Sequence, residues 1–267
     1  MIGNSSLFDH CAGQGADFQI ARPAGVEPKM KCHSLDCQDS SMSSNSEPVP
    51  AGVREAEKKI AAEAAAELVE EGMAVGLGTG TTVAYLLPAL ASRKLSIRCV
   101  ATSPRTQEVA RSLGLHVERF TVDRLDLAID GADQISPEGW LVKGGGGAHT
   151  REKLVAIAAD RFVVIADSTK MVPALHAPVP LELIAFGLES TMARLGTVRR
   201  REVPLSPNGG VIADFFGEVE DPAILAVMLE ATPGVVSHGL FPPEMVSTIF
   251  VGRGASVQRT DYPHQTS

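Results

Sequence analysis

Short apolar segments alternate with helical segments along residues 73–166, and this order constrains the fold more than any other feature. The runs with the length and composition of buried strands are 73–77, 97–101, 126–130 and 162–166. The stretches with the composition of helices are 81–92, 104–113 and 150–160. Such alternation predicts a mostly parallel sheet with helices on both faces.

A different order follows Pro180. The segments predicted there are a strand at 181–185, a helix at 188–195, strands at 197–203 and 211–216, a helix at 221–231 and a strand at 234–240. This β-α-β-β-α-β order is that of the ferredoxin-like split unit. The predicted fold class is therefore α/β, a Rossmann-like mostly parallel sheet domain with a smaller ferredoxin-like α+β domain.

The predicted domain boundaries follow these changes of pattern. Residues 1–50 are rich in Ser, Asp, Asn and Pro and have no period, so we expect a disordered N-terminal extension. Residues 51–180 and 245–267 form the predicted α/β catalytic domain, because the last apolar run at 246–251 can return to the first sheet. Residues 181–244 form the predicted α+β domain. The first helix is expected at 55–71, ended by Gly72.

The composition of the 267 residues excludes several classes of function. A net charge of −8 without a basic stripe argues against a nucleic-acid partner. No apolar run is long enough to cross a bilayer, and the N-terminus has no secretory pattern. The four cysteines form no CxxC pair, so we expect a cytoplasmic protein without disulfides. Cys32, His33 and Cys37 could bind a metal ion, but an unstructured tail explains them better.

The first chemical motif is GLGTGTT at 76–82, directly after a predicted strand. Such a turn presents backbone N–H groups at the positive end of a helix, where an anion binds. A dinucleotide fingerprint is disfavoured because Thr81 replaces its third glycine, and no acid ends the next strand. Alone, the loop is explained equally well as a tight turn.

The second motif is DGADQ at 130–134, at the carboxyl end of another strand. Open α/β sheets bind ligands outside these strand ends, so Asp130 and Asp133 are expected to approach the same crevice as the first loop. Asp-Gly is also common in plain turns, and the functional and structural interpretations are evenly balanced here.

The third motif, KGGGGAHTREK at 143–153, is the most informative. Four consecutive glycines cost chain entropy and suggest that a ligand lies against the backbone. Thr150 can cap the next helix, which places Glu152 in its first turn. A carboxylate there complements the helix dipole, yet the glycines and the neighbouring Lys143 favour a catalytic role.

The fourth motif, DSTK at 167–170, again follows a strand and offers Lys170 as a second cation for an anionic substrate. The four strand ends together supply backbone N–H groups, three carboxylates and two lysines. This set suits proton transfer beside a carbonyl with a phosphate as handle, and it does not suit a metal hydrolase.

These four motifs, in this order and spacing, resemble the ribose-5-phosphate isomerase A family. The resemblance extends from about Lys58 to Gly252 and includes PNGGVIADF at 207–215 and PGVVSHGLF at 233–241. It implies a Rossmann-like domain with a smaller α+β domain, and conversion of D-ribose 5-phosphate to D-ribulose 5-phosphate in the pentose phosphate pathway. It implies no metal or organic cofactor, a small-molecule sugar phosphate as substrate, and a homodimer or homotetramer.

The resemblance also implies residue roles. Glu152 is the expected general base that moves a proton between C1 and C2 through an enediolate. Lys58 matches a lysine that can help with the phosphate. The expected substrate-binding residues are Thr79, Gly80, Thr81, Thr82, Asp130, Gly131, Ala132, Asp133, Lys143, Gly144, Gly145, Gly146 and Lys170.

Two residues depart from the family pattern. Gln134 replaces the usual Glu after DGAD, and His149 replaces an apolar residue. One interpretation is that both residues are tolerated neighbours of the site. The other is that they change the substrate preference or the pH dependence of the enzyme. Two alternative functions therefore remain open at the level of sequence, a non-catalytic sugar-phosphate sensor and an isomerase of a related phosphosugar.

Overall fold

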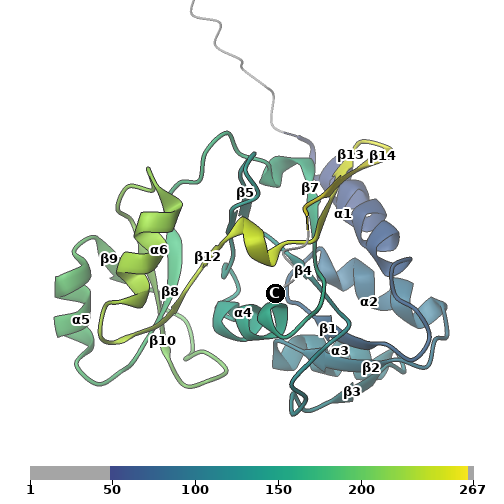
Figure 1. The fold of residues 1–267 in the computed structure, drawn as a ribbon, viewed down its shortest axis with the longest axis horizontal. Helices are drawn as coiled ribbons and strands as arrows, with labels where there is room; N and C mark the ends of the chain where they lie inside the picture. The colour runs from purple at the N-terminus through teal and green to yellow at the C-terminus, as the bar shows by residue number, and fades with distance from the viewer. Residues whose placement is uncertain (1–48, 264–267) are drawn as a thin grey trace, which may run out of the picture. The chain divides into compact units, whose positions relative to one another are not determined.

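The larger sheet of the protein has seven strands in the computed structural model, which describes residues 49–263 (Figure 1). The strand order is β14-β13-β7-β4-β1-β2-β3. The bounds are β1 (Ala74–Leu77), β2 (Arg98–Ala101), β3 (His116–Glu118), β4 (Leu127–Gly131), β7 (Phe162–Asp167), β13 (Thr248–Arg253) and β14 (Ser256–Asp261). All pairs are parallel except β13 with β14. The mostly parallel sheet predicted from the alternation is confirmed, including the return of the last apolar run next to β7.

Helices cover both faces of this sheet because alternate strand residues point to opposite sides. In β7, Val163 and Ile165 pack in the core that contains α1 (Ala51–Ala66), α2 (Val83–Ser92) and α3 (Pro104–Ser112). Val164 and Ala166 pack in a second core with α4 (His149–Ile157). Within residues 49–263, no helix is long and apolar enough to span a membrane.

A smaller antiparallel sheet has the order β11-β8-β10-β9 and lies to the left in Figure 1. Its elements are β8 (Val179–Leu183), α5 (Leu188–Leu195), β9 (Val198–Arg200), β10 (Val211–Phe215), α6 (Pro222–Glu230) and β11 (Val235–His238). Leu181 and Leu183 of β8 pack against Leu225 and Leu229 of α6. The predicted β-α-β-β-α-β order is therefore confirmed.

Several elements differ from the prediction. A third sheet of order β12-β6-β5, made of β5 (Gln134–Ile135), β6 (Leu141–Val142) and β12 (Leu240–Phe241), was not expected because two-residue strands leave no period. Strand β14 was missed because it is polar and mostly exposed. Two 3-10 turns, η1 (Ser168–Lys170) and η2 (Pro243–Met245), complete the elements.

The first helix begins and ends earlier than predicted, at Ala51 and Ala66. Arg93 donates hydrogen bonds to the carbonyl oxygens of Ala66 and Val69, so a distant side chain satisfies the end of α1. Gly72 lies in a later turn with φ +83°. The predicted disordered extension falls almost entirely outside the described residues, as do Cys32, His33 and Cys37. The division of the rest of the chain into two domains stays a prediction.

The strand order places a crevice next to the functional motifs. From β1 the chain continues through α2 to β2, which pairs with one edge of β1. Strand β4 pairs with the other edge of β1. Parallel sheets bind ligands at the carboxyl ends of strands where the connections diverge in this way. The loops at 78–82 and 132–133 leave these two strand ends.

Candidate active site

A pocket of about 100 Å³ lies at these strand ends and collects the predicted site residues. All of them line it except Asp130. The lining residues are Thr79, Gly80, Thr81, Thr82, Gly131, Ala132, Asp133, Lys143, Gly144, Gly145, Gly146, Glu152 and Lys170. The pocket therefore brings together segments from β1, β4, the third sheet, α4 and η1.

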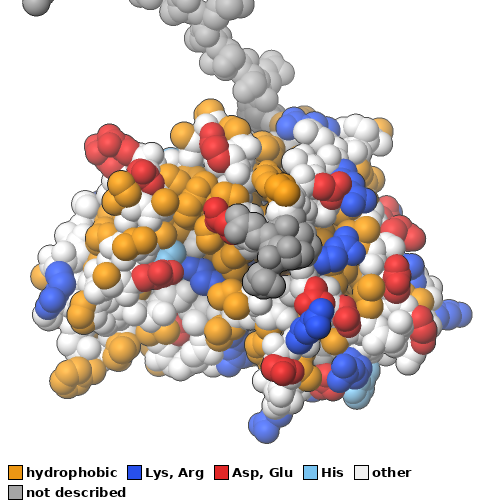
Figure 2. Space-filling view, viewed as in Figure 1, with side chains coloured by type: hydrophobic (Ala, Val, Ile, Leu, Met, Phe, Trp, Pro, Cys, Tyr) orange, Lys and Arg blue, Asp and Glu red, His pale blue; other side chains and the backbone are white. Residues whose placement is uncertain are grey.

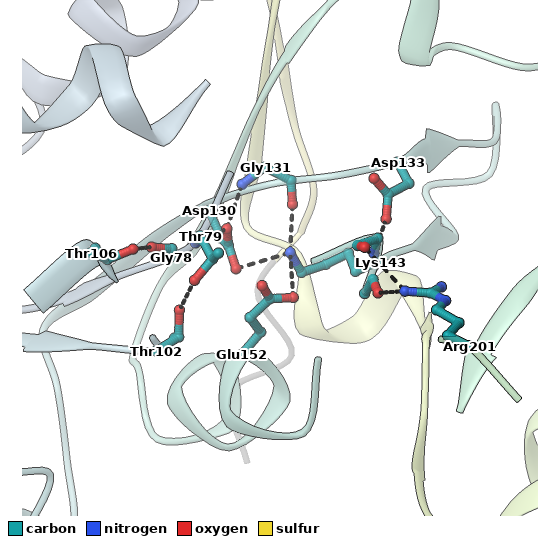
Figure 3. Close-up of polar contacts among 12 residues, drawn as sticks. Gly78, Thr79, Thr102, Thr106, Asp130, Gly131, Asp133, Lys143, Glu152 and Arg201 are labelled. Atoms are coloured by element: carbon teal, nitrogen blue, oxygen red, sulfur yellow. Dashed lines mark hydrogen bonds and ion pairs between the residues drawn. The ribbon is translucent and has the colours of Figure 1, made fainter. Parts of the chain in front are cut away.

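Three buried charged groups meet at the base of the pocket (Figure 3). The Nζ atom of Lys143 lies 2.9 Å from Asp130 Oδ2 and 3.2 Å from Glu152 Oε2, and it donates a 2.6 Å hydrogen bond to the carbonyl oxygen of Gly131. The three side chains are only 3 to 5% exposed. Asp130 thus holds Lys143 from behind, while Lys143 and Glu152 reach the pocket wall.

The electrostatics of this cluster follow from two carboxylates that share one ammonium group. Burial, followed by the charge of Asp130, raises the pKa of Glu152 to about 8, although Lys143 opposes this shift. Burial also raises the pKa of Asp130 against the opposing effect of Lys143. Burial works against the charge of Lys143, but Asp130 and Glu152 outweigh it and raise its pKa. Lys143 therefore stays charged, while Glu152 takes up a proton at a higher pH than an ordinary glutamate does.

The first glycine loop is built around the Asp130 carboxylate. Thr79 N donates to Asp130 Oδ1 at 2.9 Å, and a Cβ atom on Gly78 would lie only 1.9 Å from the same oxygen. Thr106 donates a 2.9 Å hydrogen bond to the carbonyl oxygen of Gly78, and the hydroxyls of Thr79 and Thr102 lie 2.8 Å apart. Because Gly78 has no side chain, the loop can approach the Asp130 carboxylate closely. The carboxylate in turn holds the loop in place at the amino end of α2.

The second glycine loop is held from several sides. Gly145 N donates a 2.7 Å hydrogen bond to Asp133 Oδ2, and Gly144 has a φ of +107°. A Cβ atom on Gly144 would lie 2.7 Å from Nδ1 of His149, so the buried imidazole closes one side of the loop. Thr150 does not cap α4 as predicted, since the N-cap is Ala148 without a side-chain bond. The hydroxyl of Thr150 donates instead to the Glu182 carboxylate.

The remaining residues of interest lie away from the pocket. Gln134 Nε2 donates to the carbonyl oxygen of His176 at 2.8 Å, and its Oε1 accepts from His176 N at 2.9 Å. A glutamate could not make the first of these bonds, which explains the amide structurally. Lys58 pairs with Glu55 at 2.7 Å and does not line the pocket.

The sequence of this chain is similar to those of known proteins. Residues 98–256 match the sequence profile of the family described as Ribose 5-phosphate isomerase A (phosphoriboisomerase A). Ribose-5-phosphate isomerase A of Caulobacter sp. (strain K31) is 46% identical over 201 residues, which cover 69% of this chain and 89% of that protein. The chain belongs to the ribose-5-phosphate isomerase A family.

Solved structures of the ribose-5-phosphate isomerase A family extend the agreement to the fold. Ribose 5-phosphate isomerase A of Methanocaldococcus jannaschii superposes with a TM-score of 0.73 at 32% identity, covering 77% of this chain and 98% of that one. A D-ribose-5-phosphate isomerase in complex with phospho-erythronic acid gives 0.74 at 31% identity, covering 78% and 99%. Each match therefore spans nearly the whole of the relative and more than three quarters of this chain.

One buried residue near the site gives a prediction about stability. His149 is fully buried, and neither ring nitrogen has a hydrogen-bond partner among residues 49–263. The backbone of Ser237 faces the ring and favours its charged form without reaching hydrogen-bond geometry, yet burial dominates and lowers the pKa of His149 to about 3. The folded protein therefore keeps the imidazole neutral at pH values at which the unfolded chain protonates it.

Replacing His149 with leucine is expected to stabilise the protein, increasingly so in acid. Above the ordinary histidine pKa of about 6.5 both states are neutral, whereas below it only the unfolded chain binds the proton. His149 thus lowers the free energy of unfolding by about 2 kcal/mol between pH 7 and pH 5. Urea unfolding at pH 7 and pH 5 gives the free energy of unfolding of the wild type and of His149→Leu. The difference between the two proteins isolates the effect of His149, because the effect of His238 is the same in both. An equal loss of stability in both proteins would contradict this account.

Proposed function

We propose that the protein interconverts D-ribose 5-phosphate and D-ribulose 5-phosphate in the non-oxidative pentose phosphate pathway, with Glu152 as general base. The observation that carries the proposal is the buried Glu152 carboxylate, 3.2 Å from Lys143 Nζ, at the wall of a pocket lined by glycine loops. Membership of the ribose-5-phosphate isomerase A family supports the substrate. The relative whose structure is a complex with phospho-erythronic acid binds a phosphorylated sugar acid, which supports the same ligand chemistry.

The two glycine loops divide the substrate between them in this proposal. Residues Thr79–Thr82 precede α2, so their backbone N–H groups lie at the positive end of a helix, which favours a phosphate group. Lys170 lines the same pocket and adds a positive charge. The loop Gly144–Gly146 adjoins Lys143 and Glu152 and holds the reacting carbons.

The proposed reaction moves one proton between neighbouring carbons. The Glu152 carboxylate removes the proton from C2 of the open-chain aldose, and the electron pair forms a C1–C2 double bond while negative charge develops on the C1 oxygen. The ammonium group of Lys143 and loop N–H groups stabilise that oxyanion. The hydroxyl proton on the C2 oxygen passes to the C1 oxygen, and Glu152 returns its proton to C1, which leaves a carbonyl group at C2 and a hydroxyl group at C1.

The two aspartates take different parts. Asp130 is buried behind Lys143 and accepts hydrogen bonds from Lys143 and from Thr79 N, so it holds the ammonium group and the first loop in place. Asp133 is exposed at the pocket, and it is the better candidate for moving protons between substrate hydroxyls. Asp130 itself does not line the pocket, although its partners Lys143 and Thr79 do, so the proposal gives its carboxylate no direct contact with the substrate.

A coupled assay with ribose 5-phosphate tests the function directly. The proposal includes no metal ion or organic cofactor, because Lys143 and backbone N–H groups supply the positive charge that the enediolate requires. We therefore expect product to form at an undiminished rate in the presence of EDTA. The absence of product from ribose 5-phosphate, with folded protein, would overturn the proposal.

The pH dependence of kcat/KM should follow the protonation of Glu152. A general base works only when deprotonated, and burial raises the pKa of Glu152 to about 8. We expect kcat/KM to fall about tenfold per pH unit below this value. In an Asp130→Asn variant the profile should shift to lower pH, because the charge of Asp130 contributes to the raised pKa. A flat profile between pH 6 and pH 9 would contradict Glu152 as the base.

The assembly state belongs to the same proposal. We expect a homodimer or homotetramer in the cytoplasm, and hydrophobic side chains gather on one face over the elements of the smaller sheet (Figure 2). The exposed ones in this part of the chain include Phe186, Ile224, Val227 and Val236. Exposed apolar surface of this kind supports association with another copy. Light scattering of the purified protein should give the mass of two or four chains, whereas a monomer would contradict the expectation.

A further inference from the structure

The loop Gly144–Gly147 is held from outside the pocket by one arginine. Arg201 follows β9 of the smaller sheet, and its Nη1 atom donates hydrogen bonds of 3.0 Å to the carbonyl oxygens of both Gly144 and Gly145 (Figure 3). Arg201 does not line the pocket; it borders the larger neighbouring cavity instead. Its contact with the site is therefore through the loop backbone.

The position of this guanidinium group is fixed by a second residue. Arg201 Nε and Nη2 donate to the two carboxylate oxygens of Asp214 in β10, each at 2.6 Å. The side chains are 19% and 14% exposed. A two-pronged pair of this kind restricts the planar guanidinium in both distance and orientation. Asp214 also balances the charge of Arg201, which makes the arginine a poor partner for a substrate phosphate.

The two bonds from Arg201 help to determine where the loop N–H groups point, together with a 3.0 Å turn bond from Gly147 N to the carbonyl oxygen of Gly144. In a planar trans peptide the C=O and the following N–H point in opposite directions. Because the carbonyl of Gly144 points to Arg201, the N–H of Gly145 points away from it and reaches Asp133 Oδ2 at 2.7 Å. The carbonyl of Gly145 also points to Arg201, so the N–H of Gly146 points to the opposite side. Within the described chain, this N–H has no hydrogen-bond partner.

We infer that Arg201, held by Asp214, is a positioning residue for the isomerisation. It turns the carbonyls of Gly144 and Gly145 outward and so leaves the N–H of Gly146 available to the oxyanion that forms beside Glu152. The inference rests on the proposed function, and it connects the smaller sheet to catalysis without any contact between that sheet and the reacting atoms.

The test compares Arg201→Gln with Arg200→Gln in the full-length chain. Arg200 is the exposed neighbour, so the second variant loses the same charge without touching the loop. Misplacement of transition-state donors should lower kcat by about 10- to 100-fold in Arg201→Gln. The KM for ribose 5-phosphate should change by less than about threefold, because the lost interaction is made mainly in the transition state. Arg200→Gln should match the wild type in both constants.

Two further variants separate positioning from a merely structural role. Arg201→Ala should regain part of its kcat when millimolar guanidinium is added, while the Arg200 variant should not respond. Asp214→Asn keeps the bonds to the loop but loosens the guanidinium, so its kcat should lie between wild type and Arg201→Gln.

Three results would overturn the inference while the wild type still isomerises ribose 5-phosphate. These are an unchanged kcat in Arg201→Gln, a raised KM with unchanged kcat, and a loss of activity that matches the loss of folded protein by thermal unfolding. An inactive wild type would instead overturn the proposed function, so the two failures are distinguishable.

Discussion

Replacing Glu152 with glutamine is expected to lower kcat by about three orders of magnitude with little change in KM. The amide keeps the shape of the side chain but cannot accept the proton from C2. The variant should remain folded, because Lys143 then faces only Asp130, at 2.9 Å, and the buried cluster becomes neutral. Thermal unfolding should therefore give a stability at least equal to that of the wild type.

The matched control is Glu189→Gln. Glu189 is also in the first turn of a helix, α5, but it is exposed and does not line the pocket. It should leave kcat unchanged, which would exclude a general effect of removing a helix-terminal carboxylate. Near-normal turnover of Glu152→Gln would end the assignment of the base. Ligand-induced thermal stabilisation of a wild type that forms no product would favour the sugar-phosphate sensor.

Replacing Lys143 with methionine is expected to abolish most activity and to destabilise the protein by about 3 to 5 kcal/mol at pH 8. Methionine fills similar space but leaves the carboxylates of Asp130 and Glu152 buried without a cation. The oxyanion also loses its positive partner, so kcat should fall by about 10²- to 10³-fold. Urea unfolding and steady-state kinetics measure the two effects.

The pH dependence of this destabilisation has a definite sign. A buried carboxyl group whose pKa is raised in the folded state binds its proton more tightly there than in the unfolded chain. The loss of stability in Lys143→Met should therefore be largest at pH 8 and smaller at pH 5, where both carboxyl groups are protonated more easily. Adding Asp130→Asn to the variant should restore stability but not activity. A destabilisation that does not change with pH would show that lost packing, rather than charge, is responsible.

Much of the site could be predicted because its residues belong to short motifs at strand ends. Glycines, carboxylates and lysines that follow apolar runs are placed by local sequence, and the parallel sheet then brings the strand ends to one edge. This logic located Glu152, Lys143 and the two glycine loops in one pocket. It also placed Asp130 at this edge of the sheet, where the carboxylate lies behind Lys143 and outside the pocket lining.

The features that were not predicted depend on distant residues. Arg93 at the end of α1 and Arg201 at the second glycine loop act on backbone atoms far away in sequence, and neither has a local pattern. Arg201 follows two exposed arginines, and this run looks like an ordinary solvated surface. Gln134 departs from the family pattern, but only the fold shows that its amide meets the backbone of residue 176. Such contacts depend on tertiary packing, which propensity and spacing do not encode.

The contact between Gly78 and Asp130 limits which side chains these two positions of the chain can carry. A methyl group at position 78 and a carboxylate at position 130 would occupy the same space, since the separation would be 1.9 Å. The two positions, 52 residues apart, therefore constrain each other, because a side chain at position 78 leaves no room for the carboxylate at position 130. Descendants of this chain that gain a side chain at position 78 must shorten the one at 130. The carboxylate that holds the ammonium group of Lys143 beside Glu152 would be lost in the same step.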